Sequence, residues 1–400
     1  LANILAAAKE HEANAVGMSG LLVKSTVVMR ENMEEMSRQA LDVPVMLGGA
    51  ALTRQYVEDD IVRAYAAGRV AYARDAFDGL HLMDRIVNGQ FEAYLAERQA
   101  KQKARPKRDR RSRILDAVNG AAAPIRPVDV EETRLRRGEL SRGIEIPTPP
   151  FLGPRVIDAV PARALVPLLN ENMLYQFHWG YKKDGRSLPE FLAWATKELR
   201  PILNDLLERA ESEQVFAPKA VYGFWPAAAE GNDVILFAPE DTTREVARFS
   251  LPRQNKPQGL CIADFLRDIS EPGRDVIGLQ VVTIGQRASE VAREWFKENR
   301  YNDYVRLHGL GVELAEALAE HVHKRIRSEL GFAQLDARER ADLLRQGYRG
   351  SRYSFGYPAC PNLADQRQLL SLLDASRIGI ELSEEDQLWP EQSTSAIVLH

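Results

Sequence analysis

Strand-like and helix-like segments alternate regularly through residues 1–90 of the chain. Short apolar runs such as "AVGMSGLL" and "VPVMLGG" are separated by amphipathic stretches of helical length. Strands joined by such helical connections pair in parallel through right-handed crossovers. We therefore predict an α/β unit with a parallel sheet. The segment holds only three strand-like runs and opens on Leu1 rather than Met, so we expect the sheet to be incomplete and to begin upstream.

Small residues follow these strand-like runs. Ser19, Gly48, Gly49 and the stretch 73–76 stand at the expected carboxyl ends of the strands. Parallel sheets bind ligands beyond those ends, and small residues let a bulky ligand approach the backbone closely. A simpler interpretation is that "GMSG" and "LGGA" are tight strand-to-helix turns. The residues alone leave both interpretations open.

Residues 91–147 differ in composition from the segments on either side. The run "ERQAKQKARPKRDRRSR" is strongly basic, and proline-punctuated stretches follow it. The run has no interleaved aromatic residues and no recognition motif, so it favours a solvated helix and an interdomain linker over a nucleic-acid site. The net charge of −4, from 53 basic and 57 acidic residues, selects neither nucleic acid nor an anionic membrane.

Two further features bear on the cellular compartment. The sequence has no apolar span of membrane length and no cleavable signal, which predicts no membrane partner. Its two cysteines, Cys261 and Cys360, are too far apart in the sequence to suggest a disulfide framework or a zinc site. We therefore expect a cytoplasmic protein.

Residues 148–400 mix long helices with strands that do not alternate one for one. The stretch "AVYGFWPAAAEGNDVILFAP" predicts two strands around a Gly-Asn-Asp turn, and "DVIGLQVVTIG" predicts a buried strand. Hairpins beside helices are typical of an α+β domain with a largely antiparallel sheet.

A helix expected from about Gly309 to Leu330 carries the titratable cluster Glu313, Glu316, Glu320 and His323 on one face. Such spacing suits metal ligation, but one helix supplies too few ligands, and a face of Glu, His and Lys is usually solvated. We predict no metal site there. Neither His321 nor His323 has a recognisable Ser or Cys nucleophile, and no phosphate-binding loop is present.

The stretch "RYSFGY", residues 352–357, combines complementary residue types in what we interpret as a rigid turn. Arg352 offers a planar, charged fork that suits a carboxylate. Tyr353, Phe355 and Tyr357 offer aromatic faces to a ring or a cation. The stretch therefore suits an amino acid joined to a base. The alternative is a surface loop whose aromatic residues pack on the domain.

"RYSFGY" followed by "PACP" resembles the Arg-x-x-x-Gly-Tyr signature of the activation domain of cobalamin-dependent methionine synthases. "ELAEALAEHVHKRIRSELGF", "CIADF" and "LWPEQSTSAIVLH" resemble other stretches of that domain. "VGMSGLLVKSTVVM", "VMLGGAALTRQYVEDDI" and "YARDAFDGL" are similar to the second half of the family's cobalamin-binding domain. The resemblance covers nearly the whole chain except the basic linker, in the family's order.

This resemblance implies a Rossmann-like cobalamin-binding portion over 1–90, a linker over 91–147 and an activation domain over 148–400 that is truncated at its carboxyl end. It implies methionine synthase activity, in which methyl passes from methyltetrahydrofolate through cobalamin to homocysteine. The segment's part would be reductive remethylation of cob(II)alamin to methylcobalamin, with S-adenosylmethionine as methyl donor and flavodoxin or a similar reductase as partner. Zinc is expected only in the absent homocysteine module, which would lie upstream together with a folate module.

The resemblance also implies site residues. Arg352 would hold the carboxylate of S-adenosylmethionine, beside the backbone of Tyr353 and the side chain of Tyr357. Glu316 matches the family's acidic residue on the long helix. A second acidic contact falls on Asn170 or Glu171, and the charge of the latter favours it. For cobalamin, Ser19 would contact the nucleotide tail and Ser25 would end the hydrogen-bond relay to the cobalt ligand. The full expected set is Ser19, Val23, Ser25, Gly48, Gly49 and Ala76.

The chain also departs from the family pattern. It lacks the Asp-x-His-x-x-Gly loop that supplies the histidine on cobalt, so we assign no catalytic residue, and it stops before a tyrosine-containing stretch that completes the S-adenosylmethionine pocket. We expect this segment alone to bind cobalamin poorly and not to complete methionine synthesis. Two alternatives remain: a separate reactivation module that acts on another cobalamin protein, and a non-enzymatic sensor that binds nucleic acid through the basic linker.

Overall fold

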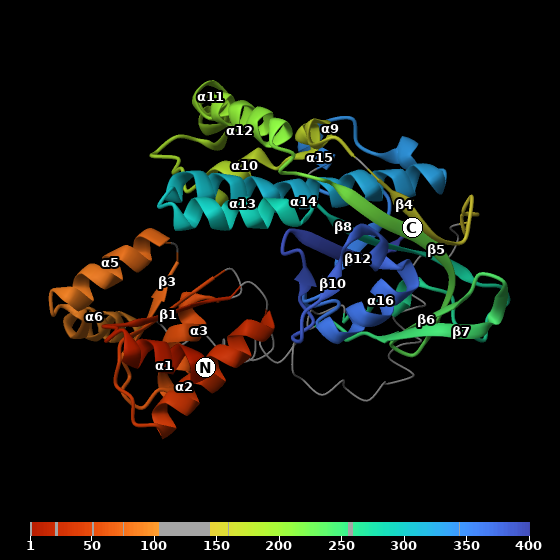
Figure 1. Ribbon diagram of the computed structural model, residues 1–400. Coiled ribbons are helices and arrows are strands. Elements are labelled where there is room, and N and C mark those ends of the chain that lie inside the picture. Colours follow the sequence, from red (N-terminus) through yellow and green to blue (C-terminus); the bar gives the residue numbers. More distant parts are fainter. Residues whose placement is uncertain are drawn as a thin grey trace. The chain divides into compact units, whose positions relative to one another are not determined.

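The structure is a computed structural model that divides into two compact units (Figure 1). It describes residues 2–20, 23–49, 52–74, 76–103, 145–158, 160–254, 259–343 and 345–400. Unit 1 comprises the described residues of Leu1–Pro127, Gln254–Gly259 and Gly356–Pro361. Unit 2 comprises those of Val128–Arg253, Leu260–Phe355 and Asn362–His400.

Unit 1 contains a three-stranded parallel sheet in the order β1-β2-β3. Its strands are β1 (Val16–Ser19), β2 (Val45–Gly48) and β3 (Val70–Ala73). Ser19 pairs with Gly48, and Gly48 pairs with Ala73, so the three strands end at one edge of the sheet. The predicted parallel sheet is confirmed.

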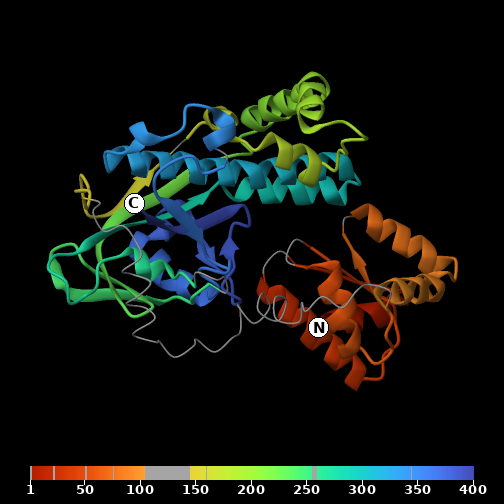
Figure 2. The same ribbon diagram turned by 180° about the vertical axis from the view of Figure 1, so that it is seen from behind.

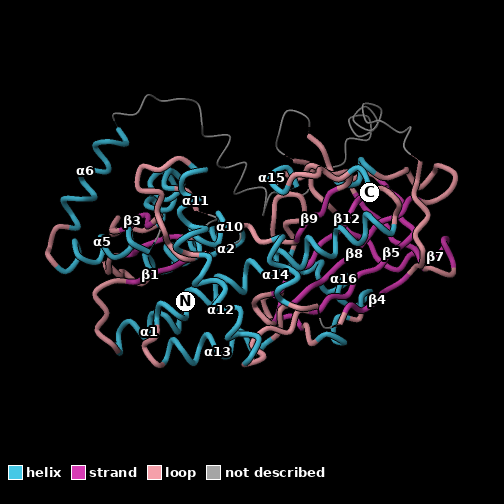
Figure 3. The backbone as a smooth tube through the Cα atoms, turned by 90° about the horizontal axis from the view of Figure 1, so that it is seen from above, coloured by secondary structure: helices cyan, strands magenta, loops and turns pink. Residues whose placement is uncertain are grey.

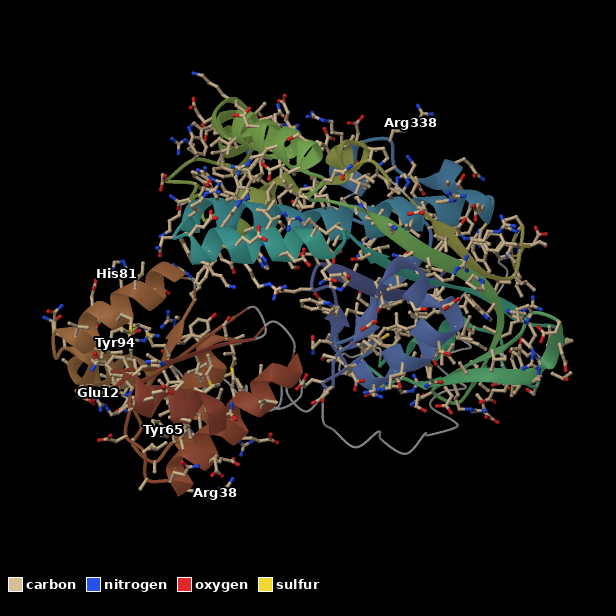
Figure 4. All side chains as sticks on the ribbon, in the orientation of Figure 1. Glu12, Arg38, Tyr65, His81, Tyr94 and Arg338 are labelled. Carbon is tan, nitrogen blue, oxygen red and sulfur yellow. The ribbon has the colours of Figure 1, made fainter. Side chains whose placement is uncertain are left out.

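The helices of unit 1 follow the predicted alternation. They are α1 (Ala2–Glu10), α2 (Val23–Arg38), α3 (Arg54–Tyr56), the π-helical η1 (Val57–Ile61), α4 (Val62–Ala64), α5 (Ala76–Val87) and α6 (Phe91–Lys103). The run α3–η1–α4 ends at Tyr65, which is 1% exposed and donates its hydroxyl to the carbonyl of Val43 at 2.9 Å (Figure 4). Phe91 and Tyr94 of α6 pack with Ile86 of α5. Both residues of α6 belong to the stretch 91–147 that is predicted to be a linker.

Unit 2 is built on a seven-stranded sheet in the order β7-β6-β5-β8-β12-β9, with β4 also paired to β5. All of its pairings are antiparallel, as predicted. Glu230 pairs with Asp233 across Gly231 and Asn232, so the aspartate of the predicted Gly-Asn-Asp turn is the first residue of β6. The strands are β4 (Gly153–Ile157), β5 (Lys219–Glu230), β6 (Asp233–Ala238), β7 (Asp241–Ser250), β8 (Asp275–Thr283), β9 (Ser351–Ser354) and β12 (Ser393–Leu399); β10 (Glu381–Leu382) and β11 (Leu388–Trp389) form a separate pair.

Helices cover both faces of this sheet, with α14 beside α13 on one face and α16 on the other (Figures 1 and 2). Figure 3 shows α14 running over β8 and β12. The strand β8 is therefore buried along its whole length, and the Gln280 amide donates to the carbonyl of Ala319 on α14 at 3.1 Å. The α-helices are α9 (Ala162–Leu165), α10 (Glu171–Met173), α11 (Leu188–Glu198), α12 (Arg200–Ser212), α13 (Gln286–Lys297), α14 (Tyr301–Glu329), α15 (Arg340–Leu343) and α16 (Gln366–Leu373).

Short 3-10 and π-helical segments connect these elements of unit 2. They are η2 (Val166–Leu168), η3 (Leu174–His178), η4 (Ile262–Phe265), η5 (Ala333–Leu335), η6 (Leu363–Asp365) and η7 (Ala375–Ile378). None of the helices in the described part of the chain is both long and apolar enough to cross a membrane.

Asp365, at the end of η6, gives unit 2 a pH-dependent stability. Burial raises the pKa of Asp365 from 3.8 to about 6, and the hydrogen bond donated by Asn362 only partly opposes this. The folded chain therefore holds this proton more tightly than the unfolded chain. The stability that the group contributes is present below pH 4 and is lost as the pH rises through about 6.

We expect Asp365→Asn to raise the free energy of unfolding at pH 7 by about 1–2 kcal/mol and to leave it nearly unchanged at pH 4. Urea unfolding of both proteins at the two pH values measures the difference. Asp374→Asn, which removes another carboxylate at an end of α16, is the control for the substitution itself. An Asp365→Asn effect of equal size at both pH values would contradict the assignment.

Candidate functional site

The candidate site is a polar face of the long helix α14. Glu316, Glu320, His323 and Arg327 lie four, three and four residues apart, which places them on one side of the helix. Gly309 lets this helix lie close to His178. A Cβ at Gly309 would be 2.5 Å from the Cβ of His178, which is too close for any other residue. A face of one helix thus carries two carboxylates, an imidazole and a guanidinium.

Arg352 meets this face from strand β9, at the edge of the sheet, where its backbone pairs with Val398. Its Nη1 donates to a carboxylate oxygen of Glu320, and its Nη2 donates to Glu316 at 3.2 Å. Burial opposes the guanidinium charge, but Glu316 and Glu320 outweigh this effect and raise the pKa of Arg352. Arg352 therefore stays charged, and its side chain is 20% exposed.

The structure corrects the expectation of a turn over the whole of residues 352–357. Residues Ser351–Ser354 form a strand, because they pair with β12, and the turn follows only after Ser354. Tyr353 lies on this strand opposite Ile397 and is half-buried. Tyr357 lies in the segment Gly356–Pro361 of unit 1, is 55% exposed and forms a β-bridge with Cys360.

A second layer of side chains lies behind Arg352. Arg327, with a side chain only 1% exposed, donates to Asp336 at 2.9 Å and to Glu320 at 3.2 Å. The Tyr348 hydroxyl donates to Glu320 at 3.3 Å, and the guanidinium of Arg327 lies 3.9 Å from the centre of the Tyr348 ring. Burial, and then the charge of Glu320, raise the pKa of Tyr348 to about 12, so this hydroxyl remains a donor.

The predicted solvated face of α14 is solvated only in part, because Glu313 and His323 are buried whereas Glu316 is exposed. Burial, helped by Arg327 and Arg352, lowers the pKa of His323 to about 2, so its ring is neutral. The ring packs edge-on against Tyr348, and neither of its nitrogens has a hydrogen-bond partner among the described residues. Glu313 instead lies 3.1 Å from Nε2 of His178. No group of three or more possible ligands in the described ranges is arranged to hold a metal.

The second predicted acidic contact lies on the short helix α10. Glu171 is its first residue and forms an ion pair with Arg200 at 2.9 Å. Asn170 caps the same helix, and its side chain accepts from the backbone N–H of Met173 at 3.2 Å. Of the two residues, Glu171 thus supplies a carboxylate that pairs with an arginine, whereas the side chain of Asn170 caps the helix.

In unit 1, three of the predicted cobalamin residues, Ser19, Gly48 and Gly49, stand at the carboxyl ends of β1 and β2. Ser19 is exposed, and Gly48 and Gly49 are half-buried. A Cβ at Gly48 would lie 2.8 Å from the carbonyl oxygen of Ala73, so close packing of the chain itself requires a glycine there. Val23 and Ser25 lie in the first turn of α2, and Ala76 opens α5; the side chains of these three residues lie outside the described residues.

Sequence reasoning missed the second layer behind Arg352. The sequence pattern indicates Glu320 only as a possible metal ligand, and it singles out none of Arg327, Asp336 and Tyr348. The available signal was the spacing from Glu316, which places Glu320 and Arg327 on the same helical face. Asp336 and Tyr348 join through tertiary contacts that no local pattern indicates.

Comparison with known families agrees with this picture. Residues 189–400 match the family described as vitamin B12 dependent methionine synthase, activation domain. The chain belongs to this family. The resemblance that "RYSFGY" and its neighbouring stretches carry is thereby confirmed.

Relatives of the family extend the similarity over the whole chain. The methionine synthase of Mycobacterium tuberculosis (strain ATCC 25618 / H37Rv) is 44% identical over 425 residues, and that of Mycobacterium leprae (strain TN) is 42% identical over 428. Each alignment covers 100% of this chain and 35% of the relative, so the chain spans about a third of their length. A crystal structure of the MetH reactivation domain bound to AdoHcy matches with a TM-score of 0.61 and 25% identity, covering 68% of this chain and 86% of that one.

Proposed function

We propose that this chain carries out the reactivation step of a cobalamin-dependent methionine synthase, with S-adenosylmethionine as methyl donor. The single observation that carries the proposal is the charged, partly exposed fork of Arg352 set among the carboxylates of α14. Membership of the activation-domain family and the likeness to a domain bound to AdoHcy support it. The wider activity, transfer of methyl from methyltetrahydrofolate to homocysteine, belongs to the same proposal.

Arg352 and Glu316 are proposed to bind the amino-acid end of the ligand. The guanidinium has five N–H donors, and Glu316 and Glu320 occupy only two of its nitrogens, so donors remain for the ligand's carboxylate. Glu316 is 52% exposed and can accept a hydrogen bond from the ligand's ammonium. Tyr353, Tyr357 and Glu171 are proposed as the further contacts. Together these groups act by positioning the methyl donor.

Cobalamin is proposed to bind unit 1 at the carboxyl ends of its strands. The residues present fit such a ligand, because Ser19 exposes a hydroxyl and the backbone at Gly48 and Gly49 is partly exposed at the same edge. Val23, Ser25 and Ala76 complete the proposed set. When bound, cobalamin supplies the metal that carries the methyl group.

The remaining partners are proposals of the same kind. We propose a flavodoxin-like reductase as electron donor, and homocysteine and folate modules as further parts of the system, with zinc confined to the homocysteine module. We also propose the domain limits 1–90, 91–147 and 148–400 and a cytoplasmic location.

Titration calorimetry with S-adenosylmethionine tests the proposed function. We expect saturable binding, and we expect Arg352→Ala to weaken it roughly tenfold or more, which corresponds to about 1.4 kcal/mol. Arg345→Ala is the control, because that side chain is 80% exposed and pairs only loosely with Asp342 at 3.8 Å. The titration is repeated with a version of the protein that continues past His400. Absence of binding in both versions would overturn the proposal.

A further inference from the structure

Glu320 is held on several sides, unlike the other carboxylate that touches Arg352. It accepts hydrogen bonds from the Arg352 guanidinium, from Nη2 of Arg327 at 3.2 Å and from the Tyr348 hydroxyl at 3.3 Å. Its side chain is 18% exposed, whereas that of Glu316 is 52% exposed. The two carboxylates on Arg352 therefore differ: one is fixed and the other is free to rearrange.

The constraint on Glu320 originates deeper in unit 2. Arg327 is anchored by Asp336, which accepts from its Nε at 3.0 Å and from its Nη2 at 2.9 Å. The side chains are 8% exposed at Asp336, 1% at Arg327, 18% at Glu320 and 20% at Arg352. A chain of alternating charges thus runs from the interior to the surface and ends on the guanidinium of Arg352.

This chain of contacts restricts the orientation of Arg352. An arginine side chain loses much rotamer freedom when its fork is fixed, and a fork that is already oriented loses less on binding a carboxylate. The cluster already carries one more carboxylate than guanidinium, since Arg327 and Arg352 face Glu316, Glu320 and Asp336. A ligand that adds a carboxylate is therefore better accommodated when it also carries a cationic group, which an amino acid provides in its ammonium.

We propose that Glu320 is a positioning residue that holds Arg352 in the orientation that receives the ligand's carboxylate. Glu316, the exposed arm, exchanges its contact with Arg352 for the ammonium of the ligand. The inference rests on the proposed function, because it takes the carboxylate of S-adenosylmethionine as the group that Arg352 binds.

Two ligands that differ only in the carboxylate test this role. S-adenosylmethionine and decarboxylated S-adenosylmethionine are titrated into the wild-type chain, Glu320→Gln, Arg352→Ala and the double variant. We expect the wild type to prefer S-adenosylmethionine roughly tenfold or more. Glu320→Gln should lose most of this preference while it binds the decarboxylated ligand within about twofold of wild type. The double variant should bind like Arg352→Ala alone, because Glu320 acts through Arg352.

Glu329→Gln is the matched control. Glu329 lies on the same helix, is 20% exposed and accepts from an arginine, Arg325, at 3.0 Å and from a tyrosine, Tyr222, at 2.7 Å. It should keep the full preference between the two ligands. If Glu320→Gln does not fold, Tyr348→Phe removes one donor to Glu320 and should lower the preference about twofold to threefold.

The outcomes separate the inference from the proposed function. If the wild type binds neither ligand, with or without the continuation past His400, the proposed function fails and the inference fails with it. If only the version that continues past His400 binds, the variants are made in that version. If the wild type prefers S-adenosylmethionine and Arg352→Ala removes the preference, the proposed function stands. In that case, an unchanged preference in Glu320→Gln, or an equal loss for both ligands, overturns the positioning role of Glu320.

Discussion

Replacing Arg327 by methionine is expected to lower the free energy of unfolding by about 3–5 kcal/mol. The side chain is 1% exposed and sits between Asp336 and Glu320, which are only 8% and 18% exposed. Methionine fills similar space but leaves the buried carboxylate of Asp336 without its partner, and it removes one of the three donors to Glu320. Urea unfolding at pH 7 measures the loss.

Arg325→Met is the matched control for this substitution. Arg325 is two residues away on the same helix and pairs with Glu329 at 3.0 Å, but its side chain is 47% exposed. Exposed pairs contribute little, so we expect a loss below about 1 kcal/mol. Adding Asp336→Asn to Arg327→Met should recover part of the stability, because it removes one stranded charge. Equal, small effects of Arg327→Met and Arg325→Met would contradict the reasoning.

The buried position of Arg327 illustrates what the sequence can and cannot predict about the site. Its spacing from Glu316 and Glu320 is visible in the sequence and predicts a shared helical face. The burial of that face is not visible, because it depends on Tyr348 and Asp336, which come from segments after the helix. The pattern of Glu313, Glu316, Glu320 and His323 therefore predicts a solvated surface, and it gives no indication of the second layer behind Arg352.

The fold was more predictable where local signals decide it. The alternation in residues 1–90 predicts the parallel sheet of unit 1, and the Gly-Asn turn between Glu230 and Asp233 predicts the β5–β6 hairpin of unit 2. The order of the strands in the sheet of unit 2 could not be predicted from local signals, because β12, from the last residues of the sequence, inserts between β8 and β9. Pairing between strands so distant in sequence has no local signature. The placement of Arg352 on an edge strand follows from that pairing.

Gly49→Ala is expected to destabilise unit 1 by about 3 kcal/mol or more. Gly49 has a φ of +107°, which L side chains rarely adopt, and an added Cβ would lie 2.1 Å from the carbonyl oxygen of Gly20. The colliding atoms belong to the backbone, so no side-chain rotation relieves the contact. Hydrogen exchange is the measurement: amides of β1–β3 should exchange faster than in wild type, while those of β5 and β8 keep their protection.

Gly68→Ala separates the two causes of this effect. Gly68 also has a positive φ, +66°, but nothing lies within 4 Å of its added Cβ, so only conformational strain of about 1 kcal/mol is expected. A similar mild effect of Gly49→Ala would show that the close approach to Gly20 is not needed. If Gly49→Ala also leaves the β-strand amides protected but abolishes cobalamin binding, the glycine serves the ligand rather than the fold. If the amides of Gly49→Ala exchange faster in the absence of cobalamin, Gly49 is instead required for the packing of the strand-to-helix turns.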